Sequence, residues 1–104
     1  MLNPTDLRPD ERVLFLGIPA PEVIQEAAAR VTQGVIVAFG DSEKVREARR
    51  AARDLENVMF VPATPDEIPW PDGFFTRVVD LVGEWPSPER VHAEVQRVTA
   101  RAAG

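Results

Sequence analysis

Short continuous apolar runs alternate with amphipathic stretches along the chain. The continuous runs are typical of strands buried on both faces of a parallel sheet, whereas apolar residues at helical spacing predict helices packed on that sheet. The predicted strands cover Val13–Leu16, Val35–Phe39, Val58–Val61 and Phe75–Val82. The predicted helices cover Pro21–Val31, a segment from Asp41 or Ser42 to about Leu55, and a last segment that starts at Ser87–Pro88 and carries Val91, Val95, Val98 and Ala102 on one face.

Strand and helix follow each other in turn, and a proline-rich loop over Pro62–Gly73 precedes the fourth strand. This order predicts an α/β fold with about four mostly parallel strands and three helices. No internal repeat, low-complexity tract or linker interrupts the pattern. Residues 1–104 are therefore expected to form a single domain.

Composition narrows the chemistry. The 104-residue chain contains no cysteine, which excludes disulfides, a thiol nucleophile and thiolate metal ligands. No apolar run approaches the ~20 residues that span a bilayer, and residues 1–12 lack the apolar stretch of a signal peptide. We therefore expect a cytoplasmic protein without membrane association. The formal net charge of −5 argues against nucleic acid as a partner.

Few charged side chains stand out as candidates for chemistry. The charges of four arginines in the second predicted helix are offset by those of four acidic neighbours. We interpret the arginines as a solvated helix face rather than a phosphate-binding patch. The arginines are Arg46, Arg49, Arg50 and Arg53, and the acids are Glu43, Glu47, Asp54 and Glu56. His92 is the only histidine and has no metal-ligand spacing. On the last helix, Glu94 is expected to pair with Arg90 and Arg97 on the exposed side. We predict no catalytic residue and no metal site.

Residues of the loops have equally plain interpretations. Asp66, Glu67 and Asp72 are interpreted as solvated acids of the proline-rich loop. Trp70 and Trp85 lie next to prolines, where aromatic–proline packing is expected. For Trp85 a pocket wall or a dimer contact is the alternative, because it follows the fourth strand.

Several short motifs keep one order and one spacing along nearly the whole chain. Glu11–Gly17 reads ERVLFLG and Ile68–Gly73 reads IPWPDG, and they are followed in register by Phe75, Val78–Val79, Glu94 and Arg97–Val98. With these motifs the chain resembles class I S-adenosylmethionine-dependent methyltransferases, in particular the type 11-like enzymes that act on small molecules. The resemblance covers the N-terminal half of their fold. The resemblance implies a Rossmann-like sheet that is truncated before the family's later strands.

The residues that hold the cofactor in that family are largely replaced. The family's first-strand acid corresponds to Phe15, and of the glycines in the following turn only Gly17 remains. Pro19 and Pro21 stand where the later glycines are expected. Proline offers no N–H to a ligand, and its ring narrows the space beside the backbone.

Two further acids of the family are affected. The acid that holds the ribose hydroxyls corresponds to Gly40 or Asp41, and the one that holds the adenine amino group corresponds to Thr64. Asp41 is the remaining candidate for the ribose contact, and a helix cap is the interpretation that we favour. The resemblance thus implies Gly17, Asp41 and Thr64 as vestigial cofactor contacts. We expect no cofactor, or S-adenosylmethionine if the family function survives.

The fourth predicted strand would pair, in that family, with a strand beyond the end of this sequence. Its apolar residues Val78, Val79, Leu81 and Val82 would then form an exposed edge, and such edges pair readily with other chains. We therefore expect a homodimer in which this edge pairs with its own copy.

Three functions follow from these features. The first is a methyltransferase-like protein without catalysis that acts as a homodimeric binding or regulatory module. The second is an S-adenosylmethionine-dependent methyltransferase, minimal or completed by a partner chain. The third is a small-molecule binder that uses the cleft at the strand ends, because α/β sheets bind ligands there.

Overall fold

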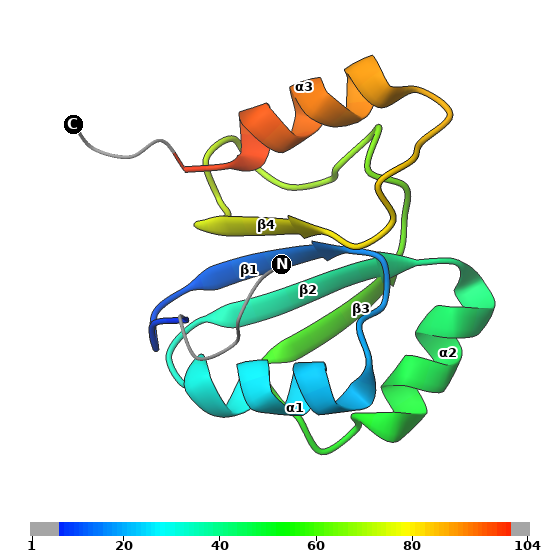
Figure 1. Ribbon diagram of the computed structural model, residues 1–104. Coiled ribbons are helices and arrows are strands. Elements are labelled where there is room, and N and C mark those ends of the chain that lie inside the picture. Colours follow the sequence, from blue (N-terminus) through cyan, green and yellow to red (C-terminus); the bar gives the residue numbers. More distant parts are fainter. Residues whose placement is uncertain (1–6, 101–104) are drawn as a thin grey trace.

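A parallel sheet lies between two helices on one face and a third helix on the other (Figure 1). The computed structural model describes residues 7–100. The strands are β1 (Arg12–Leu16), β2 (Val35–Gly40), β3 (Val58–Pro62) and β4 (Arg77–Asp80). The helices are α1 (Pro21–Arg30), α2 (Ser42–Ala51) and α3 (Pro88–Val98). The predicted α/β fold with four strands and three helices is confirmed.

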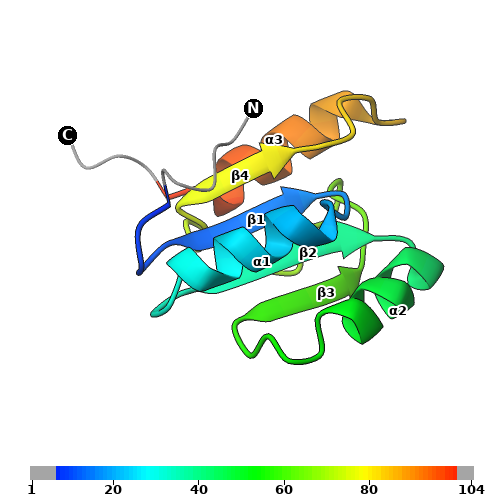
Figure 2. The ribbon, with the colours of Figure 1, turned by 60° about the horizontal axis from the view of Figure 1, so that its bottom comes forward.

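The strand order is β3-β2-β1-β4, and every neighbouring pair is parallel (Figure 2). At the centre, Leu14 of β1 is paired with Val37 of β2 on one side and with Val78 of β4 on the other. β3 and β4 are therefore the two edge strands. Because all strands run in the same direction, their carboxyl ends meet at one edge of the molecule.

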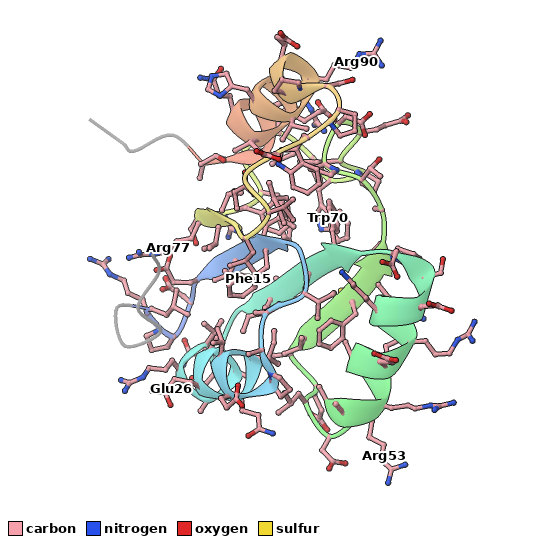
Figure 3. The ribbon with its side chains drawn as sticks, turned by 45° about the vertical axis from the view of Figure 1, so that its right-hand side comes forward. Phe15, Glu26, Arg53, Trp70, Arg77 and Arg90 are labelled. Atoms are coloured by element: carbon pink, nitrogen blue, oxygen red, sulfur yellow. The ribbon has the colours of Figure 1, made fainter. Side chains whose placement is uncertain are left out.

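Side chains of β1 alternate between two cores. Val13 and Phe15 pack with α1 and α2, and Leu14 and Leu16 pack on the opposite face with α3 and the long loop before β4. All four are at most 1% exposed. From the loop, Trp70 points toward the sheet (Figure 3), where its ring lies 5.8 Å from that of Phe39.

The fourth strand is shorter than predicted, because Asp80 forms a turn at its end. One carboxylate oxygen of Asp80 accepts hydrogen bonds from the backbone N–H groups of Val82 (2.9 Å) and Gly83 (2.8 Å), and the other accepts from the indole of Trp85 (3.1 Å). The prediction that Leu81 and Val82 belong to the strand edge is therefore wrong. Burial alone would raise the pKa of Asp80, but these hydrogen bonds outweigh it and hold the pKa below its ordinary value.

Two predicted elements were longer than the observed ones at other positions, namely at the start of the fourth strand and at the end of the second helix. Phe75 lies outside β4 because it forms an isolated parallel bridge with Thr99, just after α3. Its N–H donates to Val98 O at 2.8 Å, and its carbonyl accepts from Ala100 N at 2.7 Å. α2 ends at Ala51 rather than near Leu55, since the N–H of Leu55 closes a tight turn onto Ala52 O. Ala102, predicted for the last helix, lies outside the described residues.

Glu94 and Arg97 are more than an exposed pair. The guanidinium of Arg97 contacts the Glu94 carboxylate at 2.8 Å and Asp72 at 2.7 Å, and it also donates to the backbone carbonyls of Ile68 and Trp70. Glu94 in turn accepts the N–H of Ile68 at 2.9 Å. The hydrogen bonds from Arg97 and Ile68 lower the pKa of Glu94. This network fastens the long loop to α3.

Glu11 is the one buried charged residue in the described part of the chain. Its carboxylate accepts hydrogen bonds from Thr76 Oγ1 and from Arg77 Nε, both at 2.7 Å. Burial raises the pKa of Glu11, but these two contacts outweigh it and bring the pKa below its ordinary value. The contacts join the start of β1 to the start of β4.

We predict that Glu11→Gln lowers the free energy of unfolding by about 1–2 kcal/mol at pH 7, since charge-assisted hydrogen bonds are lost. Because the folded pKa is depressed, this contribution is complete above about pH 4.3 and declines as the pH falls through the folded pKa. Urea unfolding of both proteins at pH 7 and pH 3 measures it. The matched control is Glu26→Gln, which removes an exposed pair at 3.3 Å with Arg30 and is expected to cost about 0.5 kcal/mol or less. A Glu11→Gln effect of equal size at both pH values would contradict the prediction.

Candidate functional site

A cleft of about 540 Å³ lies at the carboxyl ends of the strands. We call it the strand-end cleft. It brings together all three predicted cofactor contacts, Gly17, Asp41 and Thr64. The other lining residues are Ile18, Phe39, Gly40, Ser42, Lys44, Pro62, Ala63, Pro65, Val82 and Trp85. Trp85 is thus part of a pocket wall, the alternative that its position after the fourth strand suggested.

Gly17 begins the turn that follows β1. Its φ of +114° requires glycine, and its N–H donates to Phe39 O at 3.0 Å. A Cβ at this position would lie 3.3 Å from Leu81 Cβ and from Val82 Cγ2. The segment after β4 therefore packs directly on the turn, and hydrophobic side chains occupy the space over this glycine.

Gly40 ends β2 and is covered by Ile18. A Cβ built on Gly40 would lie only 2.7 Å from Ile18 Cγ1 and 3.0 Å from Ile18 Cδ1. At 2.7 Å a contact is too close for a real Cβ atom, so the Ile18 side chain would have to turn aside before a larger residue could stand at position 40. Sequence reasoning missed Ile18. Its only signal was a large apolar residue directly after Gly17.

Asp41 and Thr64 have partners of their own. Asp41 is the N-cap residue of α2, and its Oδ1 accepts the N–H of Lys44 at 2.9 Å; the predicted cap is confirmed. The hydroxyl of Thr64 contacts Asp66 Oδ1 at 2.6 Å. Both residues lie at the cleft, but these local contacts are ordinary cap and turn chemistry. A role in holding a cofactor stays a prediction for both.

S-Adenosylmethionine fits the strand-end cleft poorly. A ribose needs an acceptor pair at the end of the second strand, and the candidates there are Gly40, which carries no acceptor and lies beside Ile18, and Asp41, whose Oδ1 already accepts the N–H of Lys44. At its methionine end the cofactor carries an ammonium group that needs an acceptor and a carboxylate that needs N–H donors, whereas near the first turn the chain has Pro19, Pro21 and the fully buried Phe15. We derive no chemical step through this cofactor.

A second cavity of about 540 Å³ lies between α1 and α2 and is mostly apolar. Its wall includes Ile24 of α1, Ala48 of α2, Phe60 of β3, and Leu81 and Val82 after β4. Leu81 and Val82 are 44% and 51% exposed. They were predicted as part of a dimer edge; they line this cavity, and their part in a dimer stays a prediction.

The other residues considered from the sequence do not form a catalytic or metal-binding cluster in the described part of the chain. His92 is exposed on α3. Within residues 7–100 no three histidine or acidic side chains come together as a metal site. No helix in the same region has the length and apolar character required to cross a membrane. Three arginines of α2 and Arg53 just after it do gather around one hollow, together with Ser42 and Pro62.

Comparisons with known proteins identify the fold. No family model matches the sequence, and no curated protein matches it either. Among solved structures, the YcgJ protein from Bacillus subtilis superposes with a TM-score of 0.79 at 22% identity, over 92% of this chain and 42% of that one. A SAM-dependent methyltransferase from Aquifex aeolicus gives 0.73 at 22% identity, over 86% and 51%. The [4+2]-cyclase SpnF gives 0.77 at 23% identity, over 90% and 36%.

These likenesses show the Rossmann-like fold of class I S-adenosylmethionine-dependent methyltransferases, as the resemblance in sequence implied. The chain spans about half the length of these structures, or less. The shared part contains the strand-end cleft. What the larger proteins do is therefore no direct guide to the activity of this chain.

Proposed function

We propose that this chain is a methyltransferase-like protein that has lost catalysis and acts as a homodimeric binding or regulatory module. The observation that carries the proposal is the packing of Ile18 on Gly40. Where Gly40 is the counterpart of the family's ribose-binding acid, no carboxylate is present at this position and the Ile18 side chain lies over it.

The energetic consequence is large. Hydrogen bonds between a carboxylate and two ribose hydroxyls are worth about 1.5–3 kcal/mol each. Losing both lowers affinity by about two to four orders of magnitude, since each 1.4 kcal/mol is a factor of ten. The prolines after Gly17 remove backbone donors on top of this. Cofactor affinity would then fall below the range that supports turnover.

A fold of this kind is compatible with other roles. Sites are built on folds, and the same fold carries unrelated functions. One of the similar structures is named as a [4+2]-cyclase rather than a methyltransferase. This supports treating the methyltransferase fold as a scaffold, with its function decided by the residues at the cleft.

We predict that neither S-adenosylmethionine nor S-adenosylhomocysteine binds at ligand concentrations of about 1 mM. Isothermal titration into the purified protein, with a methyltransferase of the same fold as positive control, measures this. Thermal unfolding with and without each compound is the independent readout, because a ligand that binds the folded state raises the unfolding temperature. A saturable micromolar affinity would contradict the proposal and favour a working methyltransferase.

The dimer part of the proposal depends on β4. β4 is an edge strand, and Phe75 just before it directs its N–H and carbonyl away from β1, toward the segment after α3. Backbone groups alternate along a strand, so those of Val79 lie on the same outer edge. A second copy of β4 is the partner that we propose for this edge.

Light scattering at micromolar concentration is expected to give twice the monomer mass. Val79→Pro is expected to return the protein to the monomer, because proline removes an outward N–H from the edge. Val79→Ala is the control, since it shortens the side chain and keeps the N–H. Circular dichroism checks that both variants are folded. A monomeric parent protein, or a dimer that survives Val79→Pro, would overturn pairing through β4.

A further inference from the structure

A hollow of about 460 Å³ beside α2 is lined almost wholly by arginines. We call it the arginine hollow. It is formed by Ser42, Arg46, Arg49, Arg50, Arg53 and Pro62. Ser42, Arg46, Arg49 and Arg50 recur at intervals of three and four, which places them on one face of α2, and Arg53 lies in the turn just after the helix. Pro62 adds the end of the edge strand β3. Arg53 projects from the far end of this helix, away from the sheet (Figure 3).

These guanidinium groups have no carboxylate partner in the described part of the chain. The ion pairs found there join Glu26 with Arg30, Glu11 with Arg77, and Arg97 with Asp72 and Glu94. The acids near α2 offset the arginines in the sum of charges. None of them lies within 4.0 Å of one of the four guanidinium groups, and none lines the hollow.

One arginine is already held in place. Arg49 Nη2 donates to Phe60 O at 2.8 Å, which fixes this guanidinium against β3. Ser42 lies in the first turn of α2, where the helix dipole favours negative charge. Four like charges around one hollow repel each other. A bound anion would relieve this repulsion and meet donors that are partly ordered before it arrives.

The guanidinium groups and the spacing between the arginines indicate which anion would bind. Guanidinium groups bind phosphate through paired N–H donors. Arg46 and Arg50 are about 6 Å apart along the helix axis, so these two arginines can contact successive phosphates. The net charge of −5 disfavours a long polyanion that would cover more of the surface.

We infer that the arginine hollow binds a small molecule through a di- or triphosphate group. This inference is independent of the proposed loss of methyl transfer, because the hollow shares only Ser42 and Pro62 with the strand-end cleft. It revises the expectation that these arginines are only a solvated helix face. The exposure of the four side chains is what access for such a ligand requires.

Pyrophosphate and tripolyphosphate are the probes, titrated at low salt and followed by calorimetry and by the Nε–Hε signals of the arginines. Tripolyphosphate is expected to bind tighter than pyrophosphate, and orthophosphate weakest. Arg46→Gln/Arg50→Gln is expected to weaken tripolyphosphate binding by about tenfold or more, or ~1.4 kcal/mol. Arg49 is kept because of its contact with Phe60. The control is Arg8→Gln/Arg90→Gln, which removes the same charge away from the hollow and is expected to change affinity by less than about twofold.

Three results would overturn the inference. One is no binding of tripolyphosphate at about 1 mM. Another is an equal loss in both double variants, which would mean that overall charge rather than the hollow attracts the anion. The third is tighter binding of a single-stranded oligonucleotide than of tripolyphosphate, which would make the face a nucleic-acid surface. Circular dichroism of each variant confirms that a lost affinity reflects the removed arginines and not unfolding.

Discussion

Burial of β1 on both faces is the constraint on which the rest of the structure depends. Its four central side chains are at most 1% exposed, and they point alternately toward the α1–α2 layer and the α3 layer. A strand in this position needs a parallel neighbour on each side, and β2 and β4 supply them. The carboxyl end of β1 therefore opens into the strand-end cleft, and the turn at Gly17 decides what this cleft can hold.

The same packing explains how the cleft departs from a cofactor site. After Gly17 the chain places Ile18 over Gly40, and after β4 it places Leu81 and Val82 over Gly17. Each contact buries apolar surface, which stabilises the fold. Each also fills space beside the backbone where a ligand would need polar groups. On the proposed function, the features that hold the strand ends together also oppose cofactor binding.

Most of the fold could be predicted from the sequence, because buried strands and amphipathic helices leave distinct patterns. The resemblance in short motifs also identified the cleft and three of its residues, Gly17, Asp41 and Thr64. The end of β4 could not be predicted, since apolar residues continue past Asp80 and only its side-chain hydrogen bonds stop the strand.

Contacts between distant segments were beyond the reach of local patterns. The packing of Ile18 on Gly40 joins two strand ends, and the network of Arg97 joins α3 to a loop. The arginines of α2 show the same limit in another form. In the sequence, the positive charges of these arginines are balanced by neighbouring acids. In the structure, the arginines line one hollow and the acids do not.

The central claim is that Ile18 packs on Gly40 in the strand-end cleft and that the cofactor does not displace it. It is tested most directly by NMR of protein labelled at the isoleucine δ1 methyl groups, of which the sequence has four. The account predicts a nuclear Overhauser effect between the Ile18 methyl and the Gly40 α-protons, unchanged by about 1 mM S-adenosylhomocysteine. Loss of this contact, with a saturable shift of the Ile18 signal on addition of the compound, would contradict it.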